Sequence, residues 1–271
     1  MPDWRCRPEA SSPALLTGLS RLTEWHCLTD HPLTLFTVAE QLDCPEFSRR
    51  LADLAGRRGV TIACHGWSHR CWSAWPADPA GFSEMLAAAG DRLAEFAGDA
   101  WRPWFRAPGG YIAPWMAEPL AAAGFSLDSS VNPSPLLHRK SGRRKDGQMV
   151  ADRRGSNGWH AVLGAMRDAR VVERPWSTLR WPLGPALPAC GPALTLPLLG
   201  PLARRHWRRS TTGRPASEAE LLDEGEAVRA LYWHVLDHSR LGWNPPLADS
   251  GAALTDEAAG TTTSVNGRMN G

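Results

Sequence analysis

Two histidines that follow an apolar run have a spacing suited to binding one metal ion. The run is Val60–Ala63, and His65 and His69 come directly after it. Neutral imidazole is the commonest side-chain ligand for zinc and similar ions, and a short loop leaving a rigid strand can aim two rings at one point. For a pair standing alone, two surface or capping histidines would be the commoner explanation.

Further segments downstream also carry side chains that serve in catalytic sites. A guanidinium and a glycine turn occur together in Phe105-Arg106-Ala107-Pro108-Gly109-Gly110-Tyr111. Acids occur in Gly124-Phe125-Ser126-Leu127-Asp128-Ser129-Ser130 and in Val172-Glu173-Arg174-Pro175, and a late histidine ends Leu231-Tyr232-Trp233-His234. In barrels of parallel strands, side chains at the carboxyl ends of strands converge on one mouth, so we expect His65, Arg106 and His234 to lie together.

Together with the histidine pair, these segments resemble the polysaccharide deacetylase family, also called the NodB homology or carbohydrate esterase family 4 domain. Their order and approximate spacing match over about residues 13 to 246. The resemblance implies an α/β fold, a distorted (β/α) barrel, and a divalent metal ion, with zinc expected, bound by His65 and His69. It also implies that His234 is the catalytic acid and that Arg106 orients an acid, which in the family is the general base.

The same resemblance implies several contacts with substrate. It places Pro108, Gly110 and Tyr111 along one wall of the site, with the backbone N–H of Tyr111 or a neighbour facing an oxyanion. Trp67 and Asp128 are assigned to substrate binding on the same basis. Phe-Arg-Ala-Pro, the Asp-Ser-Ser run and Glu-x-Pro are most similar to the bacterial branch of the family associated with exopolysaccharide export.

One part of the family pattern is absent from the sequence. Members open with a strand that ends in two acids, one a metal ligand and the other the general base, and here the first strand is expected to be missing. Asp3 is assigned as the third metal ligand and a catalytic residue, with a frayed terminus as the alternative. No residue can be assigned as the usual base, so either the natural start lies upstream or the chain is a shortened and impaired member.

Composition restricts the class of protein. A chain of 271 residues with net charge +2 fits one α/β domain, and the charge favours neither nucleic acid nor an anionic membrane as partner. We expect a catalytic domain over residues 1–247 and a disordered tail over residues 248–271. The six cysteines form no Cys-x-x-Cys pair, and no leader or membrane-spanning run is present, which predicts reduced thiols and a cytoplasmic location. Oligomeric state is not indicated.

Hydrophobic periodicity predicts helices alternating with short parallel strands. Helices are expected near Leu15–Leu22, Phe47–Leu54 and Phe82–Phe96, with strands at residues 33–38 and 59–63. A strand is expected before Arg106, followed by a helix from Pro114 to Gly124 and a mobile loop over residues 139–158. The capping box Ser217-x-x-Glu220 is expected to open a further helix, which leads into a strand at residues 230–233. The fourteen tryptophans are expected mainly to fill the core, with stacking on sugar rings as the alternative.

The leading functional hypothesis is a metal-dependent hydrolase that removes an acetyl or similar small acyl group from an N-acylated sugar of a polysaccharide or lipid-linked glycan. Two alternatives remain: a metal-independent hydrolase of cyclic amides from the same superfamily, and a catalytically silent carbohydrate-binding member. For the acid, His234 is favoured over the nearby His238, although His234 could also be a core histidine.

Overall fold

The fold is built on a five-stranded, fully parallel sheet in the strand order β1-β2-β3-β4-β7. A computed structural model describes residues 12–131, 139–143, 149–153, 158–179, 187–188, 194, 197–239 and 244–248. The strands are β1 (Leu33–Thr37), β2 (Val60–Cys64), β3 (Trp101–Phe105), β4 (Leu127–Asp128) and β7 (Val172–Glu173). Because every pair of neighbouring strands in this sheet is parallel, all the carboxyl ends lie along one edge.

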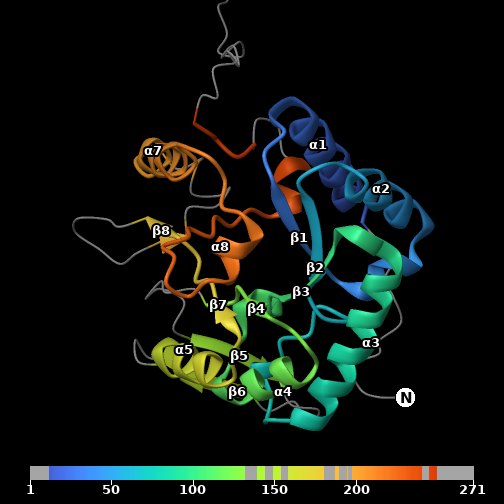
Figure 1. Cartoon of the computed structure of the whole chain (residues 1–271), viewed down its shortest axis with the longest axis vertical. Coiled ribbons are helices and arrows are strands. Elements are labelled where there is room, and N and C mark those ends of the chain that lie inside the picture. The colour runs from blue at the N-terminus through green and yellow to red at the C-terminus, as the bar shows by residue number, and fades with distance from the viewer. Residues whose placement is uncertain are drawn as a thin grey trace, which may run out of the picture.

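A helix connects each strand to the next and covers one face of the sheet (Figure 1). Parallel neighbours need such crossovers. The covering helices are α1 (Pro13–Thr29), α2 (Pro45–Ala55), α3 (Pro79–Ala97), α4 (Ala117–Ala122) and α5 (Gly158–Asp168). The three helices and the strands expected before residue 106 are therefore confirmed.

The two faces of the sheet bury different sets of side chains. On the face toward the helices, Ile62, Cys64 and Phe105 are fully buried in the main core. On the opposite face, Ala63, Trp104 and Leu127 pack against Leu221 and Leu222. These two leucines belong to α8 (Glu218–Leu222), so the short helix covers the face of the sheet opposite the main core, which we call its inner side.

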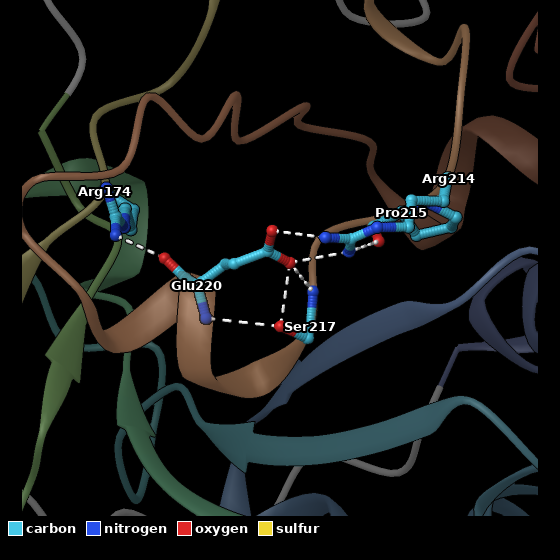
Figure 2. Close-up of polar contacts among 5 residues, drawn as sticks. All are labelled: Arg174, Arg214, Pro215, Ser217 and Glu220. Atoms are coloured by element: carbon cyan, nitrogen blue, oxygen red, sulfur yellow. Dashed lines mark hydrogen bonds and ion pairs between the residues drawn. The ribbon is translucent and has the colours of Figure 1, made fainter.

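The start of α8 is the capping box expected from the sequence. The Ser217 hydroxyl accepts from the Glu220 N–H at 3.3 Å, and the Glu220 carboxylate accepts from the Ser217 N–H at 2.8 Å. Figure 2 shows the same carboxylate facing Arg214, which donates to both of its oxygens. The carbonyl of Glu220 points the other way and accepts from Arg174, which joins the helix to the end of β7.

Two predictions about elements are wrong. Residues 139–158 include an antiparallel pair, β5 (Arg139–Arg143) with β6 (Met149–Arg153), and the first residue of α5, instead of forming one loop. Residues 230–233 are not a strand, since only Ala230 forms a bridge, with Trp176. The expected helix from Pro114 begins with a 3-10 turn, Pro114–Met116, before α4.

The described part of the chain also contains the short pair β8 (Thr178–Leu179) with β9 (Leu187–Pro188), the helix α7 (Gly200–Ser210) and a 3-10 helix at Val235–Ser239. Its main sheet has two edges, so the closed form of the expected barrel is not seen among these residues. Residues 1–11 and 249–271, which include Asp3 and nearly all of the expected tail, lie outside the description.

Candidate functional site

Side chains of the sequence motifs follow neighbouring strands at the carboxyl edge of the sheet. His65 follows β2, Arg106 follows β3, Ser129 follows β4 and Arg174 follows β7. The ends of the strands are joined by backbone bonds, since the Arg106 N–H donates to the Cys64 carbonyl at 3.0 Å. The sheet therefore brings together residues that are far apart in sequence.

His65 and His69 face each other. Their ring centroids are 5.2 Å apart, with an edge-to-face angle of 69°. The loop between them depends on Gly66, whose φ of +88° favours glycine and where a Cβ would lie 3.1 Å from the Ser68 carbonyl oxygen. The sharp turn at Gly66 lets both rings approach one point.

His234 belongs to the same cluster. Burial, together with the neighbouring charges of His69, Arg106 and His234, lowers the pKa of His65 to about 3. Burial and His234 also lower the pKa of His69. His234 is therefore near enough to influence both rings electrostatically, and the convergence of all three imidazoles on one point stays a prediction.

The orientation of the His65 ring is set by the backbone of the next strand. Its Nδ1 lies 2.6 Å from the Arg106 carbonyl oxygen. A carbonyl can only accept, so Nδ1 carries the proton and Nε2 keeps its lone pair. Metal-binding histidines generally have this arrangement, with one ring nitrogen donating to a carbonyl or carboxylate and the other free to bind.

The donor set fits two ligands of a divalent ion. Both imidazoles are kept neutral near neutral pH by the lowered pKa values, which is the form that binds metal. Within the described ranges, no group of three or more His, Cys, Asp and Glu side chains could hold a metal ion. The assignment of Asp3 as third ligand falls on a residue outside the description and stays a prediction.

Arg106 is held by a serine in the described contacts. Its Nε donates to the Ser129 carbonyl at 2.8 Å and its Nη2 to the Ser129 hydroxyl at 2.9 Å. The guanidinium lies 4.2 Å from the Phe36 ring centroid and within 6 Å of those of Trp176 and Tyr232. Burial lowers its pKa to about 10, which leaves it charged at neutral pH. Its expected role in orienting an acid stays a prediction.

Two acids lie behind Arg106 as cross-strand partners. Asp128 on β4 is paired with Glu173 on β7. Burial raises the pKa of Asp128, and burial together with the Asp128 charge raises the pKa of Glu173 well above its usual value. The sequence motif contained Glu173, but no role was assigned to it, because the register that pairs the two acids is a property of the sheet.

Asp128 does not have the exposure of a substrate-binding residue. It is 0% exposed. Its carboxylate accepts from the Ser130 hydroxyl at 2.6 Å and from the Ser130 N–H at 3.2 Å. The expected contact with substrate is therefore corrected to a structural role behind the site, because the strand turns this side chain inward.

The remaining expected contacts lie on the two loops. Pro108 and Gly110 are buried in the turn after β3, where the Tyr111 N–H donates to the Pro108 carbonyl at 3.1 Å. This bond occupies the Tyr111 N–H, one of the N–H groups expected to face an oxyanion. Trp67 is partly buried and packs against the main core, which agrees with core filling.

A cavity of about 940 Å³ opens on the inner side of the sheet. Phe36, Trp104, Arg106 and Ser129 are among the residues that line it. None of the three clustered histidines is among these lining residues. Arg106 therefore lies at the wall of this cavity.

His238 is excluded as the alternative acid by its position. It is 2% exposed and lies between Trp25 and Trp233, at centroid distances of 6.0 and 5.7 Å. Its Nδ1 is 3.0 Å from the Asn244 side-chain oxygen. His238 is a buried histidine, whereas His234 is exposed.

Comparisons with known proteins add a likeness of overall structure. No family model matches the chain, and no curated protein matches it. A solved structure from Mycobacterium smegmatis, whose designation as a polysaccharide deacetylase is itself provisional, is similar with a TM-score of 0.48 and 21% identity, over 84% of this chain and 67% of that one. No described helix is long and apolar enough to cross a membrane. The functional assignment depends on the site.

Proposed function

We propose that the chain is a metal-dependent hydrolase that removes an acetyl or similar small acyl group from an N-acylated sugar of a polysaccharide or lipid-linked glycan. The observation that supports this proposal is the pairing of His65 with His69, whose ring centroids are 5.2 Å apart, just after a strand of a parallel sheet, with His234 near enough to influence both rings electrostatically. In such sheets, functional groups gather at that edge.

His65 and His69 would hold the ion. The Arg106 carbonyl fixes the His65 tautomer, so the Nε2 lone pair is available without a change in protonation. A bound divalent ion such as zinc supplies Lewis acidity toward a carbonyl oxygen and lowers the pKa of water. The expected third ligand is Asp3 or a substitute for it.

His234 would donate the proton that the departing amine needs. An amine is a poor leaving group unless it is protonated, and an exposed imidazole beside the two metal ligands can deliver the proton. Arg106, with one face against Phe36, would hold positive charge at the wall of the site, where it can orient an acidic group.

The test of this proposal is zinc binding combined with acetate release. Chelator-treated full-length protein is titrated with Zn²⁺ by calorimetry, and acetate is measured with N-acetylglucosamine oligomers as substrate. His65→Ala and His69→Ala should each weaken zinc binding by at least about 100-fold, because they remove direct ligands.

His160→Ala, on the exposed surface of α5, is the matched control and should bind zinc as the parent does. A parent that binds no zinc and releases no acetate contradicts the proposal. If that parent still bound the oligomers, the carbohydrate-binding alternative would take its place.

A further inference from the structure

We propose that Ser130 is a positioning residue for the metal ligand His65, and that it acts through the peptide group between Arg106 and Ala107. This inference rests on the proposed function, because it assumes that His65 binds a metal ion. Ser130 does not touch His65. It is fully buried at the end of β4, on a strand that is not adjacent to β2.

The contact runs through both ends of one peptide unit. The carbonyl oxygen of Arg106 accepts from His65 Nδ1 at 2.6 Å, and the N–H of Ala107, in the same planar unit, donates to the Ser130 hydroxyl at 2.7 Å. Since a peptide unit is rigid and planar, fixing its N–H also fixes the direction of its carbonyl. The Ser130 hydroxyl therefore determines where the acceptor for His65 lies.

Ser130 is itself held by an acid. Its hydroxyl donates to Asp128 at 2.6 Å, which leaves the hydroxyl oxygen turned toward the Ala107 N–H. Asp128 is fully buried and paired with Glu173, which accepts from the Val131 N–H at 3.0 Å. A run of hydrogen bonds thus connects His65 to the buried acids through Ala107 and Ser130.

The adjacent serine has a different task. Ser129 accepts from the Arg106 guanidinium and donates to the Arg174 carbonyl at 2.9 Å, so it orients a side chain and not the peptide that His65 contacts. Ser129 therefore holds the Arg106 side chain, whereas Ser130 holds the peptide group between Arg106 and Ala107. Removing the Ser130 hydroxyl leaves a buried N–H without its acceptor, and the peptide is then free to tilt.

Zinc affinity measured on four proteins tests this inference. Parent, Ser130→Ala, Ser130→Thr and Ser126→Ala are titrated with Zn²⁺ by calorimetry, and their thermal unfolding is recorded in parallel. Ser130→Ala should bind zinc about 10- to 100-fold more weakly, the usual effect of losing a group that orients a metal ligand. Ser130→Thr keeps the hydroxyl and should bind close to the parent.

Ser126→Ala makes the same atomic change just before β4 and should also bind as the parent does. Parent affinity in Ser130→Ala overturns the inference while leaving the proposed function intact. An equal loss in Ser130→Thr also overturns it, because packing and not the hydroxyl would then matter. If the parent binds no zinc, it is the proposed function that fails.

A measurement on the metal-free parent does not depend on any variant. Nitrogen-15 NMR of the imidazoles should show that Nδ1 of His65 carries the proton, and Ser130→Ala should redistribute the proton toward Nε2. A parent His65 protonated at Nε2 contradicts the inference, because its Nδ1 could not then donate to the Arg106 carbonyl.

Discussion

At the scale of single residues, the site depends on which ring nitrogen carries a proton. His65 is neutral because it is desolvated and lies near the positive charge of Arg106, and its tautomer is set by one carbonyl oxygen. His234 has a different environment, since it is exposed and lies beside the Tyr232 ring, at a centroid distance of 6.3 Å. These environments suit the two residues to different tasks, ligand and proton donor.

Removing the donor should slow the reaction without removing the metal. His234→Ala is expected to lower kcat for acetate release by about 100- to 10,000-fold, the range found when a general acid is lost. Zinc content should not change, because His65 and His69 would remain in place.

The His234 variant is measured by steady-state kinetics and metal analysis on the same preparation. His160→Ala serves as the histidine-to-alanine control. Turnover equal to that of the parent would remove His234 from the mechanism, and loss of zinc would make it a ligand.

At the scale of secondary-structure elements, Arg174 connects the sheet to the helix that covers its inner face. Its guanidinium donates to the carbonyls of Glu220, Leu221, Asp223 and Glu226, at 2.6 to 2.9 Å. These carbonyls lie at and beyond the end of α8, where a helix leaves acceptors unpaired. One buried side chain thus completes the C-terminal cap of a short helix.

Arg174→Met should therefore lower the free energy of unfolding by about 2–4 kcal/mol, because four carbonyls lose their donor in a site that is 7% exposed. Urea denaturation provides the measurement. Arg205→Met, on the exposed surface of α7, should change the free energy of unfolding by less than about 0.5 kcal/mol. Similar effects of the two substitutions would show that the cap contributes little.

At the scale of the whole molecule, the C-terminal part of the described chain returns to its first helix. Arg21 on α1 donates to the carbonyls of His238 and Ser239. The approach is close because of Gly18, where a Cβ would lie 2.4 Å from the Val235 carbonyl oxygen. This return places His234, one residue earlier, at the edge of the sheet.

Burial of the His238 ring should make the free energy of unfolding depend on pH. Burial lowers the pKa of His238 to about 4 in the folded chain, against 6.5 when unfolded. Between these pH values the unfolded chain binds the proton and the folded chain does not. The contribution of His238 to the free energy of unfolding is therefore present above pH 6.5 and is lost as the pH falls toward 4.

Urea denaturation of the parent and of His238→Gln at pH 7 and pH 5 measures this dependence. The free energy of unfolding should fall by roughly 1–2 kcal/mol more in the parent than in the variant between pH 7 and pH 5. Equal losses in the two proteins would mean that His238 keeps its ordinary pKa when folded.

The sequence by itself determined the elements that depend on local patterns. The period of apolar residues predicted α1, α2 and α3, and the spacing of serine and glutamate predicted the start of α8, because each signal lies within a few turns of one helix. It also indicated His65, His69 and His234 as one site, since the ends of parallel strands share an edge.

The tertiary structure alone decided what these side chains contact. The pairing of Asp128 with Glu173, the peptide shared by His65 and Ser130, and the burial of His238 all depend on register and packing between distant segments. The β5–β6 pair was missed for a related reason. Its strands are joined by backbone hydrogen bonds, which need no apolar pattern in the sequence.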